Sequence, residues 1–257
     1  MSEQVGRFVW YELMALDTAK ASAFYSAVVG WKGTEVGHLE PYTLLSAGAI
    51  GVGGIMTLSK PMRDASARAG WVGYVAVDDV DAAAKRVSAL GGVVHRPPGD
   101  IPEIGRFAPV SDPQGAGFIL FRPKPGGQMP APAADDSGTF CWRELLAEDW
   151  VAVWPFYSEL FGWQKRMTVD MGPMGVYQTF GTPGAEPDLG GMMTHVEPPA
   201  MACWQYTVTV EDITAGAARV VDAGGKLIRG PHPVPGARWI VHCTDLEGAR
   251  FNLVASK

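Results

Sequence analysis

The sequence predicts an α+β protein built from four similar βαβββ units, which follow one another as two halves. The first observation is an internal repeat, because the segment 8–31 recurs at 140–163 with eleven identical residues and no gap. The second is the pattern within each half, where an alternating strand pattern and a capped helical pattern precede three short strand-like runs, twice over. The third is a stretch rich in Pro, Gly and Ala between the halves, which is typical of a linker.

These observations divide the 257-residue chain into two domains of ordinary size. We place the first domain at 1–124, the linker at 125–138 and the second domain at 139–257. The linker shows no apolar periodicity, and its Pro content predicts an extended strap.

The first unit of the first half begins with a strand at 8–16. Its alternation places Trp10 and Glu12 on one face and the residues between them on the other. Asp17 is a typical helix cap, and Gly30 is a typical helix end, so a helix is predicted between them. Three short strands are predicted after it, near 33–36, 42–47 and 52–58.

The second unit begins with a strand at 73–77, after which Asp78 or Asp79 caps the next helix. Gly91 and Gly92 end that helix. The second half repeats this scheme, except that Pro155 predicts a kink or a later start for its first helix. The remaining strands of this unit are predicted near 93–96, 106–111 and 118–122.

Composition excludes several classes of function. A net charge of −6 without a basic stripe argues against a nucleic-acid partner. No run of eighteen apolar residues is present, and the polar N-terminus lacks the core of a signal peptide, so no membrane association is expected. Three cysteines without a C-x-x-C spacing fit a cytoplasmic protein with buried thiols.

Several motifs follow one another in a fixed order: F-Y and G-W at the end of the first helix, a G-G strand, V-D-D-V-D-A before the second helix and D-P-Q-G-A before the last strand. Their order resembles that of the vicinal oxygen chelate superfamily of glyoxalases, bleomycin-resistance proteins and extradiol dioxygenases. Within this superfamily the chain is similar to tandem glyoxalase-like proteins of bacteria. The resemblance implies two glyoxalase-like domains with curled, mostly antiparallel eight-stranded sheets, which hold a ligand on the concave face.

The resemblance also implies three positions in each half that hold a divalent metal in metal-dependent relatives. An indole or an aliphatic side chain offers no lone pair to a cation, and neutral amides are weak ligands alone. We therefore expect no metal cofactor. A divalent metal is the alternative, because a register slip of two residues would bring Glu12 or Glu144 to the first-strand position. The three positions hold Trp10, Val72 and Ile119 in the first half, and Trp142, Gln205 and Asn252 in the second.

Two acidic residues are the candidate catalytic groups. Glu12 and Glu144 occupy the same place in the repeat, each two residues after a tryptophan and on the same strand face. A carboxylate in apolar surroundings is costly unless it is hydrogen-bonded, and such surroundings favour a general base. The alternative is a structural role, in which each Glu is hydrogen-bonded within the fold.

Aromatic residues at strand positions predict a site for a flat or hydrophobic molecule. The five histidines have no metal-binding spacing and are interpreted as surface or core residues. The expected ligand-binding residues are Trp10, Trp71, Tyr74, Trp142, Met192, Trp204, Gln205, Tyr206 and Asn252.

Three functional hypotheses follow. The first is a small-molecule binding protein without a family-type metal site, as a monomer or homodimer. The second is a glyoxalase-like lyase, isomerase or oxygenase that uses Glu12 or Glu144 as a base or metal ligand. The third is a signalling or scaffold protein whose clefts no longer bind a ligand. The sequence does not say which half is functional.

Overall fold

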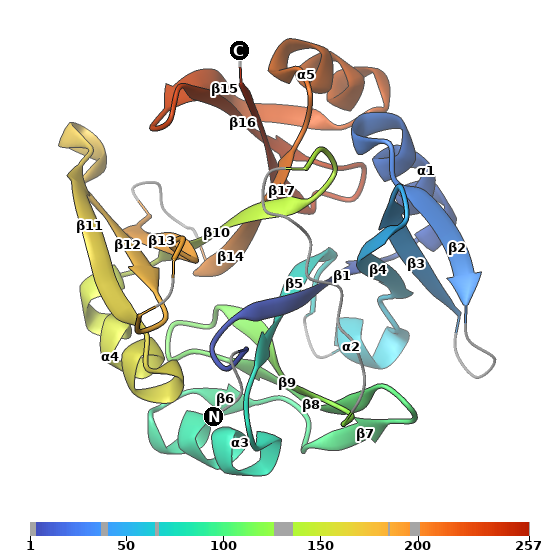
Figure 1. The fold of residues 1–257 in the computed structure, drawn as a ribbon. Coiled ribbons are helices and arrows are strands. Elements are labelled where there is room, and N and C mark those ends of the chain that lie inside the picture. The colour runs from blue at the N-terminus through green and yellow to red at the C-terminus, as the bar shows by residue number, and fades with distance from the viewer. Residues whose placement is uncertain are drawn as a thin grey trace. The chain divides into compact units, whose positions relative to one another are not determined.

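The computed structural model describes residues 4–36, 41–64, 67–125, 136–184, 186–195 and 201–256. The βαβββ pattern occurs four times along the chain (Figure 1), which confirms the predicted α+β fold class. Most of the predicted linker, residues 126–135, lies outside the described residues. No helix in the described ranges is long and apolar enough to cross a membrane.

The first half contains two modules. The first module comprises β1 (Phe8–Ala15), α1 (Thr18–Val29), β2 (Lys32–Val36), β3 (Tyr42–Ala47), β4 (Ile50–Thr57) and the short helix α2 (Lys60–Asp64). The second comprises β5 (Gly70–Ala76), α3 (Val80–Ala89), β6 (Val93–Val94), β7 (Gly99–Ile101), β8 (Gly105–Ser111) and β9 (Gly117–Pro123).

The second half also contains two modules. The third module comprises β10 (Phe140–Ala147), α4 (Trp150–Phe161), β11 (Gln164–Asp170), a 3₁₀ turn (Gly172–Met174), β12 (Val176–Gly181) and β13 (Gly190–Thr194). The fourth comprises β14 (Cys203–Thr209), α5 (Ile213–Asp222), β15 (Lys226–Val234), β16 (Arg238–Thr244) and β17 (Arg250–Ser256).

Each half contributes one open sheet. The strand order is β2-β3-β4-β1-β5-β9-β8-β6 in the first sheet, where β7 also pairs with β8, and β11-β12-β13-β10-β14-β17-β16-β15 in the second. The hairpins are antiparallel as expected, but the first strand of each module pairs in parallel with the last. The sheets are therefore mixed.

Compact packing follows a different division from the sequence halves. The central unit consists of Met1–Trp10, Val72–Met129 and Arg143–Trp204, which carry the second and third modules. The terminal unit consists of Tyr11–Trp71, Pro130–Trp142 and Gln205–Lys257, which carry the first and fourth modules. Each unit thus joins one module from each half.

Repeated motif residues hold the terminal unit together. Trp71 Nε1 donates a hydrogen bond to Tyr25 Oη at 2.7 Å, and Tyr25 donates in turn to Asp245 Oδ2 at 3.2 Å. Trp31 Nε1 donates to Gly138 O at 2.7 Å. The neighbouring F-Y and G-W motifs therefore meet the D-x-x-G motif, which lies 220 positions from Tyr25, in one buried core.

The central unit contains the same network from the other copy of each motif. Trp204 Nε1 donates to Tyr157 Oη at 3.0 Å, and Tyr157 donates to Asp112 Oδ2 at 2.9 Å. Trp163 Nε1 donates to Gly6 O at 2.8 Å. Burial raises the pKa of the Asp112 carboxyl. These motif residues are therefore explained by module packing.

Helix boundaries follow the predicted caps with one exception. Asp17 Oδ1 accepts from Lys20 N, and Gly30 takes the left-handed conformation at φ 78° that ends α1. The alternative of a later start for the third helix is wrong. Helix α4 begins at Trp150, because Asp149 caps it, and continues through Pro155.

Candidate functional site

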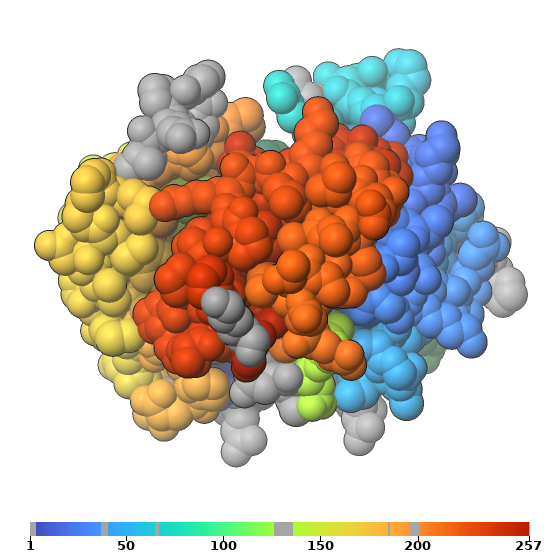
Figure 2. All heavy atoms as spheres, turned by 90° about the horizontal axis from the view of Figure 1, so that it is seen from above, coloured from blue at the N-terminus to red at the C-terminus, as the bar shows by residue number. Residues whose placement is uncertain are grey.

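In the described parts of the chain, the strands of the fourth module have α5 on one face and no helix packed on the other. In β17, Phe251 and Leu253 are at most 1% exposed and belong to the core, and α5 packs against this strand. Figure 1 shows α5 along one side of β15, β16 and β17, and its outer surface is orange in Figure 2. Because side chains alternate, Asn252 projects from the opposite, helix-free face.

The helix-free face of β14, β16 and β17 carries a set of polar side chains that we call the polar face: Gln205, Thr207, His242 and Asn252. Strand register places Asn252 between Thr207 and His242. Asn252 Nδ2 donates to Thr207 Oγ1 at 3.3 Å. Asn252 is 1% exposed, and its Oδ1 has no partner at hydrogen-bond geometry, although it lies close enough to the His242 ring to favour the protonated imidazole. An unsatisfied buried acceptor is unfavourable for folding, and it can accept a hydrogen bond from a ligand.

Two histidines meet at the edge of the polar face. His232 on β15 and His242 on β16 stack with ring centroids 5.5 Å apart and an interplanar angle of 17°. Burial lowers the pKa of His242 to about 4, and the charges of His232, Arg229 and Arg250 contribute, while the Asn252 side chain acts in the opposite direction. Burial and Arg229 also lower the pKa of His232. Both imidazoles are therefore neutral at pH 7.

This histidine pair was not found by sequence reasoning, which interpreted the histidines individually. His232 and His242 are ten positions apart, and only the irregular pairing of β15 with β16 brings them together. His242 falls in a strand-like run, but nothing in the local pattern places His232 on the neighbouring strand.

The first half carries an apolar cluster at the equivalent place. Tyr74, Ile119 and Phe121 are buried together. They occupy the repeat positions of Thr207, Asn252 and Val254. The partly buried residues packed against this cluster are Val9, Trp10, Val72 and Phe107. Only the second half therefore presents a polar face at these positions.

The side chains at the three family positions of the second half are poor ligands for a divalent metal. The three family positions supply an indole and two neutral amides, from Trp142, Gln205 and Asn252. Within the described ranges, no three His, Cys, Asp or Glu residues are arranged to hold a metal ion. In addition, the positive charges of Arg229 and Arg250 act on His242 and would repel a cation there.

The two predicted catalytic carboxylates occupy matching positions. Glu12 is directly opposite Gly54 in the parallel pair of β1 and β4, and the ring of Tyr42 fills the space that a Gly54 side chain would take. Glu12 is 4% exposed. Glu144 is half-buried and repeats this arrangement with Gly191 and Tyr177. The structure thus brings a tyrosine ring to the strand beside each Glu.

The predicted aromatic residues fall into different places. Trp71 and Trp204 are in the unit cores, where both donate to tyrosines. Tyr206 is fully buried and packs edge-to-face against Tyr11 at 5.2 Å. Met192 is also fully buried, opposite Leu145. These four residues face cores and do not meet on the helix-free face. Trp10 and Tyr74 belong to the first-half cluster, Trp142 is half-buried, and Gln205 and Asn252 lie on the polar face.

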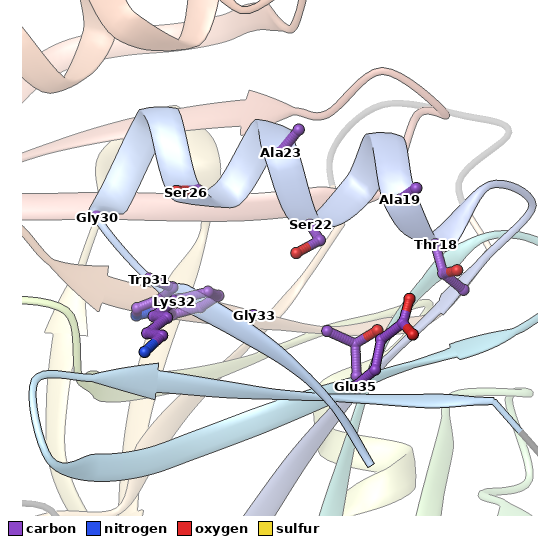
Figure 3. Close-up of a pocket in the computed structure, with 11 residues that line it drawn as sticks. Thr18, Ala19, Ser22, Ala23, Ser26, Gly30, Trp31, Lys32, Gly33 and Glu35 are labelled. Carbon is purple, nitrogen blue, oxygen red and sulfur yellow. The ribbon is translucent and has the colours of Figure 1, made fainter. Parts of the chain in front are cut away.

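A separate groove of about 560 Å³ lies between α1 and β2 in the terminal unit. Figure 3 shows Ser22 and Ser26 on the helix above Lys32 and Gly33 on the strand. In the third module, Trp154 and Lys165 take the repeat positions of Ser22 and Gly33, and Lys165 Nζ lies 4.8 Å from the ring centroid of Trp150. The groove follows from small side chains and contains none of the predicted site residues.

The fold and the paired modules define a class, namely tandem proteins built from two βαβββ pairs. The chain belongs to the Glyoxalase/Bleomycin resistance protein/Dioxygenase superfamily, whose family model matches residues 7–120 and 145–253. The predicted family is thereby confirmed.

Curated relatives match over nearly their whole length. CFP32 of Mycobacterium tuberculosis, which carries a provisional glyoxylase name, is 28% identical over 95% of this chain and 93% of its own. The anthracycline biosynthesis protein DnrV of Streptomyces peucetius is 29% identical over 97% of this chain and 93% of its own.

Solved structures share the fold at low identity. The 2,3-dioxygenase LapB of Pseudomonas sp. KL28 has a TM-score of 0.65 and 15% identity, covering 98% of this chain and 92% of its own. The Mn(II)-bound glyoxalase of Novosphingobium aromaticivorans has a TM-score of 0.65 and 16% identity, covering 98% of this chain and 83% of its own.

Proposed function

We propose that this protein binds a small oxygenated aromatic molecule at the polar face of its second half, without a family-type metal. The observation that carries the proposal is the unsatisfied Oδ1 of Asn252 on a face that also holds Gln205 and Thr207. A hydroxyl group of a ligand would satisfy this acceptor. The anthracycline biosynthesis role in the name of DnrV also supports an aromatic ligand.

The contrast between the halves supports the choice of the second half. In the first half, an apolar cluster around Ile119 occupies the place that the polar face takes in the second half. Polar side chains are therefore not required at this place for folding. Replacing a buried polar pair by apolar groups is often neutral or stabilising. The polar residues at 205, 207 and 252 are therefore better explained by a ligand than by stability.

Isothermal titration calorimetry with two related probes tests this function. The probes are 2,3-dihydroxynaphthalene, which is neutral, and 3-hydroxy-2-naphthoate, which carries a carboxylate on the same ring system. We expect at least one probe to bind, and Asn252→Leu to weaken that binding about tenfold or more, as expected when a buried acceptor loses its donor. Ile119→Leu is the matched control and should leave binding unchanged. Absence of binding by both probes, or equal binding by Asn252→Leu, would contradict the proposal.

A catalytic role for a carboxylate is the second candidate function. The observation that favours it is the repeated arrangement of Glu12 with Tyr42 and of Glu144 with Tyr177, described above. A base in either position requires the carboxylate, so Glu144→Gln or Glu12→Gln should abolish turnover of a substrate while leaving the melting temperature within about 2 °C. Loss of the fold in both variants would assign the residues a structural role.

A further inference from the structure

We propose that the ligand of the polar face is an organic anion, recognised through the arginine side chains beside the histidine pair. This inference rests on the proposed function and names the charge class of its ligand. It also explains why the place that binds a cation in metal-dependent relatives holds no anionic donor in this chain.

The charge distribution of the fourth module supports an anion. Strands β14, β15, β16 and β17 contain no Asp or Glu, although the whole chain has a net charge of −6. They contain Lys226, Arg229, Arg238 and Arg250. A concentration of one sign on one set of strands in an otherwise acidic protein attracts ligands of the opposite sign.

Strand register places two of these arginines next to the site. Arg229 is directly opposite His242 in the β15–β16 pair. Arg250 lies two positions from Asn252 on β17, so its side chain projects from the same helix-free face. In the part of the chain that the structure describes, neither Arg229 nor Arg250 has an acidic group within ion-pair distance.

The acidic residues of the β16–β17 turn have other partners. In the β16–β17 turn, Asp245 accepts from Tyr25 and from the backbone of Glu247 and Ala249. The Glu247 carboxylate accepts from Asp17 N at 2.8 Å. Neither carboxylate therefore neutralises the arginines of the helix-free face.

The second module provides an internal comparison. One of its two strand arginines, Arg106 on β8, is neutralised by Asp81 at 2.7 Å and by Asp100 at 3.0 Å. The other, Arg122 on β9, is three positions from Ile119 and so projects from the opposite face of that strand. Arg96 takes the repeat position of Arg229 and lies over the Phe107 ring, 5.5 Å from its centroid. The position of Arg250 is occupied by Gly117. Arg229 and Arg250, which have no acidic partner within ion-pair distance in the described residues, thus have no equivalent pair in the second module.

The neutral imidazoles complete the proposed site. His232 Nδ1 is buried without a hydrogen-bond partner, and a neutral imidazole can donate or accept, depending on its tautomer. A carboxylate seated between Arg229 and the histidines would accept hydrogen bonds. A hydroxyl on the same molecule would donate to Asn252 Oδ1. The ligand class is accordingly a hydroxylated aromatic carboxylic acid.

The two naphthalene probes separate this inference from the proposed function. We expect 3-hydroxy-2-naphthoate to bind at least tenfold more tightly than 2,3-dihydroxynaphthalene at low salt. Arg229→Gln and Arg250→Gln should each weaken binding of the carboxylate about three- to fivefold, which is typical of partly exposed charges, and the double variant about tenfold. The matched control Arg96→Gln should have no effect. Raising the salt concentration should reduce the preference for the carboxylate.

Each outcome has a distinct meaning. Equal affinity for the two probes, or an unchanged preference in the double arginine variant, overturns the anion and leaves the proposed function in place. Binding of neither probe overturns the proposed function. Both arginines are exposed, so their variants should melt within about 2 °C of the native protein, and a folding defect is not expected to obscure the result.

Discussion

Replacing Asn252 by leucine separates the stability of this protein from its proposed function. The Asn252 side chain is 1% exposed, donates one hydrogen bond of 3.3 Å to Thr207 and leaves Oδ1 without a partner. Leucine has the same branching pattern and carries no polar atom. At the repeat position in the first half, the aliphatic Ile119 is accommodated at 3% exposure.

The expected effect is a protein of nearly unchanged stability that binds the ligand about tenfold or more weakly. Removing an unsatisfied buried acceptor returns about 1 to 3 kcal/mol, and leaving the buried Thr207 hydroxyl without its Asn252 donor costs about 1 to 3 kcal/mol. These two contributions oppose each other, so the free energy of unfolding should change by less than about 1 kcal/mol. For a chain of this size, that limit corresponds to a change in melting temperature of less than about 2 to 4 °C.

Differential scanning calorimetry of Asn252→Leu and of the control Ile119→Leu measures this effect. A fall in the melting temperature of Asn252→Leu by more than about 4 °C, with the control unchanged, would refute the reasoning. Such a fall would mean that the amide is satisfied in the folded protein, for example by a buried water molecule, and stabilises the fold.

Three further predictions concern the packing network, the histidine pair and the metal. Tyr25→Phe removes the hydroxyl that joins the buried Trp71 indole N–H to the Asp245 carboxylate, so it should lower the free energy of unfolding by about 1 to 3 kcal/mol. Tyr157→Phe should do the same in the other unit. Chemical denaturation measures both effects. The pKa of His242 is depressed from 6.5 to about 4, so the unfolded chain takes up this proton first, and stability should fall by up to about 3 kcal/mol as pH drops from 6.5 to 4. Denaturation midpoints across this range should decline less steeply for His242→Asn, and an identical slope would exclude His242 as the cause. Treatment with a chelator should leave probe binding unchanged in calorimetry, and lost binding that Mn²⁺ restores would contradict the metal-free site.

Local sequence was sufficient for the modules. Alternation predicted the strands, and aspartate and glycine predicted the helix ends, because caps and strand faces depend on neighbouring residues. Pro155 is the instructive exception. The cap at Asp149 sets the start of α4, and the proline is included in a helix whose Phe156, Tyr157 and Leu160 are buried in the core.

The role of the repeated tryptophans could not be predicted from the sequence. Trp71 and Trp204 were expected at a ligand site, because large aromatic residues on strands suit both a pocket wall and a core. The structure gives each of them a tyrosine acceptor in a core. The choice depends on tertiary packing, because each tryptophan and its tyrosine acceptor lie on different elements, 46 and 47 positions apart in sequence.

The sequence by itself determined the four modules, the family and the positions at which relatives place their metal ligands, because these are properties of local pattern and of repeat spacing. Only the tertiary structure decided that the repeated aromatic and acidic motifs join the modules into two units, each with one module from each half, and that His232 and His242 stack beside Asn252. The physical reason is that strand register and module packing set which side chains share a face. Both are fixed by contacts between distant segments, which no local pattern contains.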